Sequence, residues 1–224
     1  MQLNADRREP VLVHGTDLPW IPSPQAGVDR RTLERSGGEV AVASTIVRYG
    51  PGSAFPPHPH ALGEEFVVLE GVFSDEHGDY PPGTYVRNPP GSTHSPGSRD
   101  GCTIFVKLRQ MSPDDTDSVT LRPDDQKWES IDAFRRIAVL HRGREGTVRF
   151  ERLAPGYRDP WPPQPAGEEI FVLEGHVDLN GSRDAGLHRW SWLRHRRERP
   201  MIVSSAGGAW LWVKSEHLID HEIR

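Results

Sequence analysis

Three histidines and one glutamate have the types and the spacing of a metal site. His58 and His60 are two residues apart, Glu64 follows four residues later, and His94 comes thirty residues after that. In a β-strand, residues two apart point to the same face, so both imidazoles would face one side. A tight turn at residues 61–63 would set the carboxylate of Glu64 opposite them. Such a ligand set suits a divalent transition metal, and it accepts iron, nickel, manganese or zinc alike.

An isolated His-x-His pair in a β protein more often lies on the surface, or in the core with its hydrogen bonds satisfied, than it binds a metal. What favours ligation here is that the four residues lie within two longer patterns, in order along the chain, and the first matches without a gap a motif of the family whose resemblance is given below. The first is Gly52-x5-His58-x-His60-x3-Glu64-x6-Gly71, and the second is Gly83-x5-Pro89-x-Gly91-x2-His94. We therefore predict that these four residues bind one metal ion.

Short strands joined by tight turns must position these side chains. The chain holds 22 glycines and 21 prolines in 224 residues, which leaves few windows for a helix and predicts an all-β fold. Apolar runs recur at intervals of about ten residues, the spacing of a sandwich or barrel. Strands are expected at residues 40–49, 65–74, 84–88 and 102–110, and again at 147–153, 169–179, 191–195 and 209–215.

The chain contains an internal repeat. Residues 52–71 align with 156–175 at half of their positions, including the shared GEE and VLEG, and the later segments match at a spacing of 107 instead of 104 residues. Two tandem β units follow, at residues 1–112 and 113–224, with the boundary in the polar stretch 112–126 and an extended, proline-containing segment at the N-terminus.

The second unit does not keep the ligand set. Pro162 and Gln164 take the places of the two histidines, Met201 takes that of His94, and only Glu168 remains. One carboxylate without imidazoles holds a transition metal poorly, so the second unit is expected to keep the fold without the site.

Composition narrows the possible partners and surroundings. The net charge of −5 gives no reason to expect nucleic acid, and no apolar run approaches the length of a membrane span. The N-terminus has no apolar signal segment, and the single Cys102 excludes an internal disulfide framework or a cysteine-rich zinc site. We expect a cytoplasmic protein. The arginine-rich run 189–200 is interpreted as a solvated loop, with an anion or partner site as the alternative. Packed side chains are expected at Cys102, Trp161, Trp210 and Trp212.

The first unit resembles the cupin superfamily and, more narrowly, the cupin domain of ChrR-type anti-sigma factors. The two patterns above and the stretch from Gly63 to Gln110 carry this resemblance, which extends over about residues 10 to 111; Ser98 stands where the second cupin motif has asparagine. The resemblance implies a jelly-roll barrel of the RmlC-like type with one divalent metal (Zn, Fe, Ni or Mn) inside, held by the residues that match His58, His60, Glu64 and His94. Glu65 points to the other face of its strand and is not counted among the ligands. The chain is thus expected to be a pair of tandem cupin barrels, the second one degenerate.

Two functions of different class follow from this resemblance. ChrR-type proteins restrain a sigma factor, and their cupin domain serves the response to an oxidative signal, which implies a sensing or regulatory module. The zinc domain that binds the sigma factor is built on histidine and paired cysteines and has no match in this sequence, so direct sigma-factor binding is not expected.

The alternative function is that of a mononuclear iron dioxygenase acting on a small diketone or hydroxyacetophenone-like molecule. Four protein ligands leave two positions open on six-coordinate iron and none on tetrahedral zinc, so the identity of the metal separates the two functions. The sequence leans slightly toward the regulatory module. Both functions allow a small-molecule ligand in the first barrel. The resemblance also implies a homodimer, although two linked barrels could satisfy the same sheet edges within a monomer.

Overall fold

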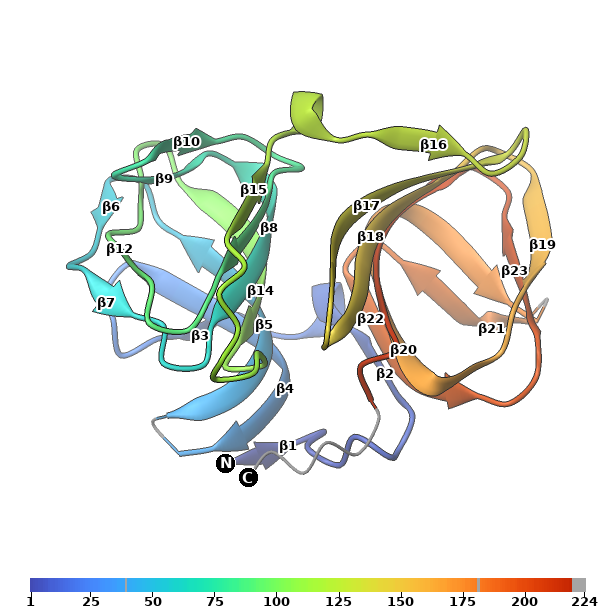
Figure 1. Ribbon diagram of the computed structural model, residues 1–224, viewed down its shortest axis with the longest axis horizontal. Helices are drawn as coiled ribbons and strands as arrows, with labels where there is room; N and C mark the ends of the chain where they lie inside the picture. The colour runs from blue at the N-terminus through green and yellow to red at the C-terminus, as the bar shows by residue number, and fades with distance from the viewer. Residues whose placement is uncertain (39, 181, 219–224) are drawn as a thin grey trace. The chain divides into compact units, whose positions relative to one another are not determined.

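The chain consists almost entirely of β-strands. The computed structural model describes residues 1–38, 40–180 and 182–218, and of residues 182–185 only the backbone. Strands make up 59% of the chain, and the helical segments in the described part are two short turns, η1 (Gly15–Asp17) and η2 (Pro123–Asp125). The strands form two compact units, each closed into a barrel (Figure 1). The predicted all-β class with two jelly-roll barrels is confirmed.

The first unit packs one large sheet against two small ones. The large sheet has the order β1-β4-β5-β14-β8-β11-β15, with β3 beside β4, and the small sheets are β10-β9-β13-β6 and β12-β7. Their bounds are β1 (Gln2–Leu3), β3 (Ile21–Pro22), β4 (Val28–Gly37), β5 (Ala41–Tyr49), β6 (Ser53–Ala54), β7 (His58–Pro59), β8 (Glu64–Gly71), β9 (Phe73–Asp75), β10 (Gly78–Tyr80), β11 (Tyr85–Asn88), β12 (Thr93–His94), β13 (Gly97–Ser98), β14 (Cys102–Leu108) and β15 (Val119–Leu121).

The interior of the first barrel follows the alternation of its strands. On β8 and β14, Phe66, Val68, Ile104 and Val106 point inward and belong to one buried cluster. Every second residue of a strand shares a face, which explains why these four alternate in the sequence. The intervening side chains are buried as well, Phe105 among them, so the runs are continuously apolar instead of alternating with polar residues.

The second unit repeats this plan with longer strands. Its main sheet has the order β16-β17-β18-β24-β20-β22-β2, and β19, β21 and β23 complete the barrel. The bounds are β2 (Val11–His14), β16 (Trp128–Ser130), β17 (Arg135–Gly143), β18 (Gly146–Leu153), β19 (Tyr157–Trp161), β20 (Gln164–Leu179), β21 (Ser182–His188), β22 (Ser191–Arg197), β23 (Met201–Ser205) and β24 (Ala209–Ser215). Trp161 and Trp212 are buried core residues as predicted, whereas Trp210 is only half-buried.

The division between the units differs from a cut after residue 112. Residues 18–126, with 1–5, form the first unit, and residues 6–17 join the chain from 127 onward in the second. The reason is strand pairing. The short strand β15 extends the first unit because it pairs with β11, whereas β2, in the extended N-terminal segment, lies along the edge strand β22 of the second unit.

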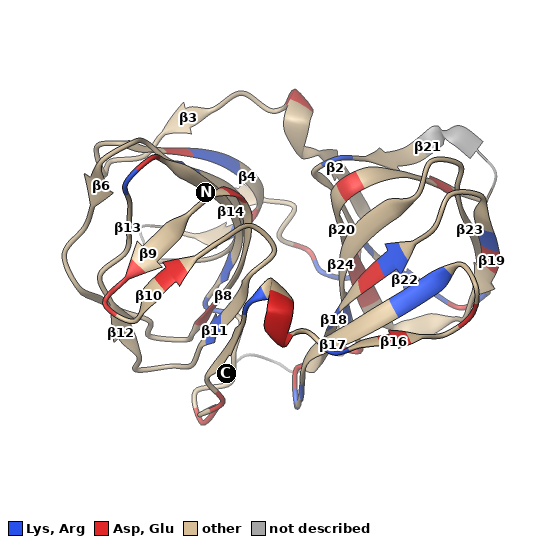
Figure 2. Ribbon diagram, turned by 90° about the horizontal axis from the view of Figure 1, so that it is seen from above, with Lys and Arg blue, Asp and Glu red and all other residues tan. Residues whose placement is uncertain are grey.

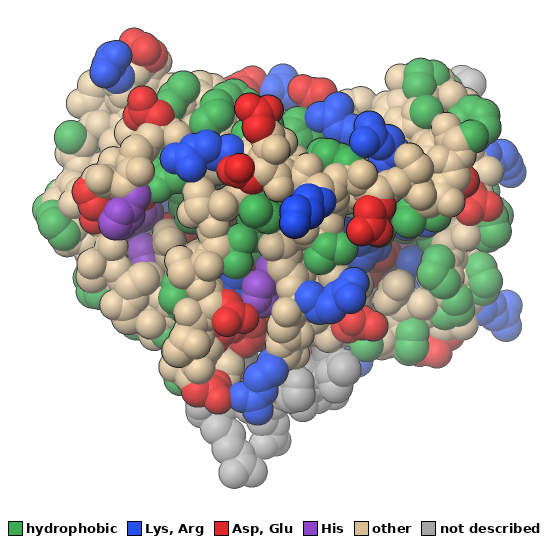
Figure 3. Space-filling model, turned by 45° about the horizontal axis from the view of Figure 1, so that its top comes forward, with side chains coloured by type: hydrophobic (Ala, Val, Ile, Leu, Met, Phe, Trp, Pro, Cys, Tyr) green, Lys and Arg blue, Asp and Glu red, His purple; other side chains and the backbone are tan. Residues whose placement is uncertain are grey.

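Charged residues are spread over both units. Figure 2 shows basic residues on β4 and β22. Figure 3 shows acidic and basic side chains interspersed over the face in view, and not gathered by sign. Among the residues that the structure describes, no helix has the length and apolar character needed to cross a membrane.

One glycine of each repeat sits where two backbones nearly touch. Gly71 has a φ of +68°, and a Cβ there would lie 2.1 Å from the carbonyl oxygen of Gly101. Gly175 has a φ of +83°, and its Cβ would lie 2.2 Å from the carbonyl oxygen of Gly208. The shared VLEG of the two repeats therefore ends on a glycine for the same steric reason.

We predict that Gly71→Ala destabilises the first unit much more than Gly52→Ala does. Gly52 has a similar φ of +73° but no atom within 4 Å of a built Cβ, so its substitution meets only the left-handed backbone penalty, about 1 kcal/mol. At Gly71 the backbone itself must move, and the loss should reach roughly 3 kcal/mol or more. Urea unfolding followed by circular dichroism measures both variants, and equal losses would contradict the steric argument.

Candidate metal centre

Two short strands and one turn bring the four predicted ligands together. In the ladder between β7 and β12, His94 lies directly opposite His58. His60 follows β7, and after a turn at Gly63, which has a φ of +75°, Glu64 begins β8. One ligand atom from each of the four side chains lies within 4.8 Å of the others. The structure therefore places all four residues at one point, as their spacing in the sequence predicts.

The spacing of the ligand atoms leaves room for one ion at the centre. Nε2 of His60 and Nε2 of His94 lie 3.6 and 3.5 Å from Oε1 of Glu64, too long for hydrogen bonds. Bonds of about 2.0–2.1 Å to a central ion put neighbouring ligand atoms roughly 3–3.5 Å apart. The three imidazole centroids are 4.7–5.1 Å from one another, so the rings surround the same space.

His60 is held in the tautomer that a metal ligand needs. The hydroxyl of Ser92 donates its single proton to the carbonyl of Pro89 at 2.6 Å, and its oxygen lies 2.9 Å from Nδ1 of His60. Since that proton is already used, Ser92 accepts from Nδ1–H, and Nε2 keeps its lone pair. Nε2 of His60 is buried and has no hydrogen-bond partner in the part of the chain that the structure describes. A buried nitrogen that faces a carboxylate and two imidazoles in this way has the arrangement of a metal ligand.

Asp75 faces the other side of His94. Its Oδ2 lies 3.5 Å from Nδ1 of His94, while its Oδ1 accepts hydrogen bonds from the backbone N–H of His77 at 2.8 Å and the hydroxyl of Tyr80 at 2.9 Å. These donors hold the carboxylate beside Nδ1 of His94, while Nε2 of the same ring faces Glu64. Burial by itself would lower the pKa of His94, but Asp75 and then Glu64 raise it.

Burial shifts the pKa values of the other three ligands toward favouring their neutral forms. Desolvation lowers the pKa of His58 and lowers that of His60 to about 4, with the neighbouring imidazoles adding to the effect. Burial also raises the pKa of Glu64, although His94 and the amide of Asn88, 3.4 Å away, oppose this shift. A buried carboxylate among three imidazoles is costly unless a positive charge compensates it, and a divalent cation would supply that charge.

The neighbouring glutamate is not part of the cluster. Glu65 accepts a hydrogen bond from the hydroxyl of Tyr85 at 2.9 Å and lies on the opposite face of β8, as predicted. Cys102 is buried, and burial raises the pKa of its thiol to about 11, so it is a packed residue without thiolate character near neutral pH.

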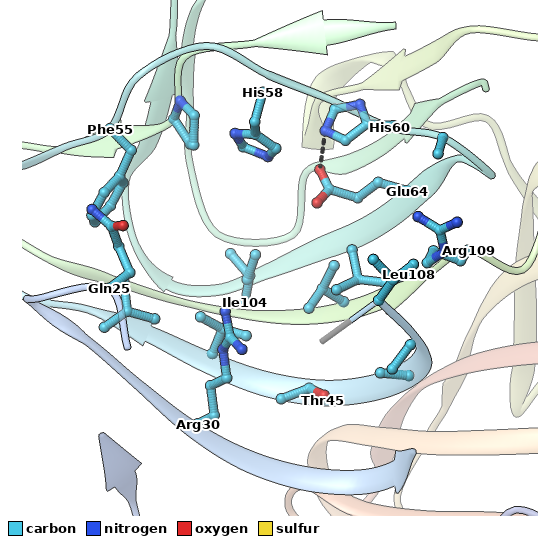
Figure 4. A pocket seen from close by; sticks show the side chains of 18 of the residues that line it. Gln25, Arg30, Thr45, Phe55, His58, His60, Glu64, Ile104, Leu108 and Arg109 are labelled. Carbon is cyan, nitrogen blue, oxygen red and sulfur yellow. Dashed lines mark ion pairs between the residues drawn. The ribbon is translucent and has the colours of Figure 1, made fainter. Parts of the chain in front are cut away.

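A cavity of about 440 Å³ opens beside the ligand cluster. Figure 4 shows His58, His60 and Glu64 along one side, with the His60–Glu64 pair marked, and Ile104 and Leu108 along the floor. Sites of roughly 300–1,000 Å³ commonly take small molecules. A small molecule in this cavity would therefore meet the ligand atoms directly.

The second barrel fills the equivalent place with side chains. In its ladder between β19 and β23, Met201 lies opposite Trp161, both almost fully buried. The strand ladder thus places Trp161 at the position of His58. The gapless alignment of the two repeats puts Pro162 there, so that prediction is wrong by one residue. The first barrel has one extra residue between Ala54 and His58, where successive prolines interrupt the strand.

Arginines compensate the glutamate that the second barrel retains. Oε2 of Glu168 accepts a hydrogen bond from Arg197 at 2.8 Å and lies 3.4 Å from His195, while Arg149 lies 3.5 Å from Oε1. Burial would raise the pKa of Glu168, but His195, Arg197 and Arg149 together lower it. Among the residues that the structure describes, the cluster in the first barrel is the one group suited to hold an ion.

The arginine-rich run is not a solvated loop. Residues 191–197 form strand β22, in which Arg194 and Arg197 are buried. Arg197 compensates Glu168, and Arg194 donates to the carbonyl of Asp6 at 2.8 Å. The composition of the run does not reveal these partners, because both lie far away in the sequence.

Sequence reasoning missed the residues that support the ligands. Neither Ser92 nor Asp75 stands in a pattern that separates it from the other polar loop residues. The one available signal for Ser92 was its place two residues before His94. Arg30, which lines the cavity, lies about thirty residues before the first ligand, and only the pairing of β4 with β5 brings it there.

Comparison with known proteins agrees with this architecture. Residues 8–112 match the family model of the ChrR cupin-like domain. No curated protein sequence matches the chain. A crystal structure from Nostoc punctiforme described as a "putative dioxygenase" is similar at 14% identity with a TM-score of 0.76, covering 97% of this chain and 86% of that one.

Two further solved structures are similar over most of the chain. The bacterial pirin YhhW of Escherichia coli, in complex with nickel(II), has 14% identity and a TM-score of 0.67, covering 92% of this chain and 98% of that one. Oxalate decarboxylase of Lactobacillus farciminis, in a formate complex, has 12% identity and a TM-score of 0.66, covering 92% and 86%. Sequence identities of 12–14% show that these proteins share a fold with this chain, and no more than that. The chain thus has the fold of two tandem cupin-type barrels, and its residues 8–112 match the family model of the ChrR cupin-like domain.

Proposed function

We propose that the first barrel binds one divalent transition-metal ion through His58, His60, Glu64 and His94 and presents it to a small molecule in the adjacent cavity. The observation that carries this proposal is the approach of the cavity to the ligand side chains themselves. A structural ion is normally enclosed by its protein ligands, whereas a catalytic ion keeps a position open. The function that this geometry supports best is that of a mononuclear metal oxygenase, the alternative of the two that the sequence left open.

The residues of the barrel would orient the ligands and shape the cavity, while the metal would supply the reactivity. Iron, when bound, would supply the Lewis acidity and the redox chemistry needed for a reaction with dioxygen. Ser92 and Asp75 orient two imidazoles, so the ligand atoms are arranged before the ion arrives. Val47 and Ile104 form part of an apolar wall that excludes water from the reacting end of the cavity.

A second function is favoured by the family match over residues 8–112. In this function the first barrel is a sensing or regulatory module, whose ion would be zinc with all four positions taken by protein. The cavity would then receive a signal molecule, without turnover.

Replacing one imidazole should remove the metal. We predict that His60→Ala retains less than about a tenth of the metal of the wild-type protein, because the affinity of such a site depends on its full ligand set. Elemental analysis of protein purified without a histidine tag measures this. Glu168→Gln is the matched control in the second barrel and should leave the metal content unchanged. Full metal retention by His60→Ala and by His94→Ala would show that the ion is held elsewhere.

Substitutions behind the ligands should weaken the site without abolishing it. Ser92→Ala removes the hydroxyl that faces Nδ1 of His60, Asp75→Asn removes the negative charge beside Nδ1 of His94, and we predict about 10- to 100-fold weaker metal binding in each variant. Titration against a competing chelator measures the affinity. Asp79→Asn, in the same hairpin but exposed, serves as the control. Wild-type affinity in both variants would mean that the two side chains do not orient the ligands.

Metal identity and oxygen uptake together separate the two functions. We predict nearly stoichiometric iron in the protein as purified, and oxygen consumption by the iron-loaded protein with members of a panel of small carbonyl compounds. Four protein ligands leave iron two further positions for substrate and dioxygen. Stoichiometric zinc with no oxygen uptake in the iron-reconstituted protein would reject the oxygenase and leave the regulatory module.

A further inference from the structure

An arginine reaches into the cavity from the wall opposite the ligand cluster. Arg30 lies on β4, where Val28, Arg30 and Thr32 alternate on the inner face and line the cavity. Its partner across the sheet is Val47 of β5, another lining residue. Figure 4 shows Arg30 directed into the cavity from the side that faces His58 and Glu64.

The guanidinium of Arg30 has no counter-ion among the residues that the structure describes. The nearest carboxylate in the sequence, Asp29, lies on the outer face and pairs with Arg48 at 2.7 Å. Glu64, in the ligand cluster, is the one acidic residue that lines the described part of the cavity, against Arg30, Arg35 and Arg109. The cavity is therefore positively charged even before an ion is added at its other end.

Burial of the charged Arg30 guanidinium costs free energy. Arg30 is half-buried, and desolvation lowers the pKa of its guanidinium; the nearby Arg35 acts in the same direction, while Tyr49 opposes it. An arginine stays protonated in proteins despite such a shift, so the cost is relieved by an anion and not by loss of the proton. Arg35 differs in that it donates to the carbonyl of Gly38.

The walls between Arg30 and the ligand cluster are apolar. Val47, Ile104 and Val106 belong to the buried core cluster and face the cavity together with Leu108. An occupant must therefore present an apolar body to these side chains and one negative group to the guanidinium. The planar fork of an arginine matches a carboxylate through two parallel hydrogen bonds.

We propose that the cavity of the first barrel binds a small organic carboxylate, with its carboxylate on Arg30, its apolar body against Val47 and Ile104, and its far end toward the His/Glu cluster. This deepens the proposed function by naming the class of its substrate or signal molecule. The contact with Arg30 does not itself require the metal.

The test uses the full chain, metal-loaded and chelator-treated, with benzoate, phenylacetate and 3-phenylpropionate and the neutral amides of the same three acids. Isothermal titration calorimetry should show at least one acid binding ten times or more tighter than its amide. Arg30→Met removes the charge at similar length and should abolish this preference, while Arg30→Lys should keep part of it. Arg48→Met, on the outer face of the same sheet, should behave as wild type. Circular dichroism verifies that each variant is folded.

The outcomes separate this inference from the proposed function. A preference for the acid that depends on Arg30 supports the carboxylate site, even in a protein that contains zinc and consumes no oxygen. Equal binding of acid and amide, or no binding of any acid, overturns it. Acid binding that needs the metal and is unchanged in Arg30→Met overturns it too, because the carboxylate would then lie on the ion. Tighter binding of phenylphosphonate than of every acid would overturn the choice of carboxylate.

Discussion

The need to compensate a buried carboxylate at the same place in each barrel shapes both sites. Glu64 and Glu168 are the first glutamates of their shared GEE segments, and both side chains are buried. Such a charge is stable only beside positive charge or hydrogen-bond donors. The first barrel surrounds its glutamate with three imidazoles and space for an ion, while the second sets a guanidinium, Arg197, against its glutamate at 2.8 Å.

The two ways of compensating the buried glutamate have different consequences for the packing of each barrel. A guanidinium belongs to the chain and leaves no open position, so Trp161 and Met201 can pack into the barrel beside it. An exchangeable ion must remain accessible, and the first barrel keeps an adjoining cavity at the cost of some core packing. In the second repeat the histidines of the ligand set are absent and the core is packed, while the strand ladder and the close glycine contact at Gly175 are kept.

The cavity connects the ligand cluster to the proposed chemistry. At one end lies the His/Glu cluster, in the middle an apolar wall, and at the other end the guanidinium of Arg30, which has no counter-ion among the residues that the structure describes. This polarity would align an asymmetric molecule with its anionic group away from the cluster and its reactive end against it. Orientation of that kind serves an oxygenase, and it would equally give a sensing module its selectivity.

The sequence by itself determined the all-β class, most strands, the repeat and the placement of His58 and His60 on one face, because each depends on local spacing: alternation along a strand, glycine at turns, and His-x-His on one face. The inclusion of His94 came from the resemblance to the cupin motifs, because it lies thirty residues after Glu64. Tertiary structure alone decided which distant residues meet. Ser92 reaches His60, Asp75 reaches His94, and Arg30 enters the cavity through strand pairings that no local pattern encodes. The same holds for Arg197, which looked solvated until its partner Glu168 was placed beside it. Local periodicity specifies backbone geometry and side-chain direction, whereas charge compensation is settled only when the barrel closes.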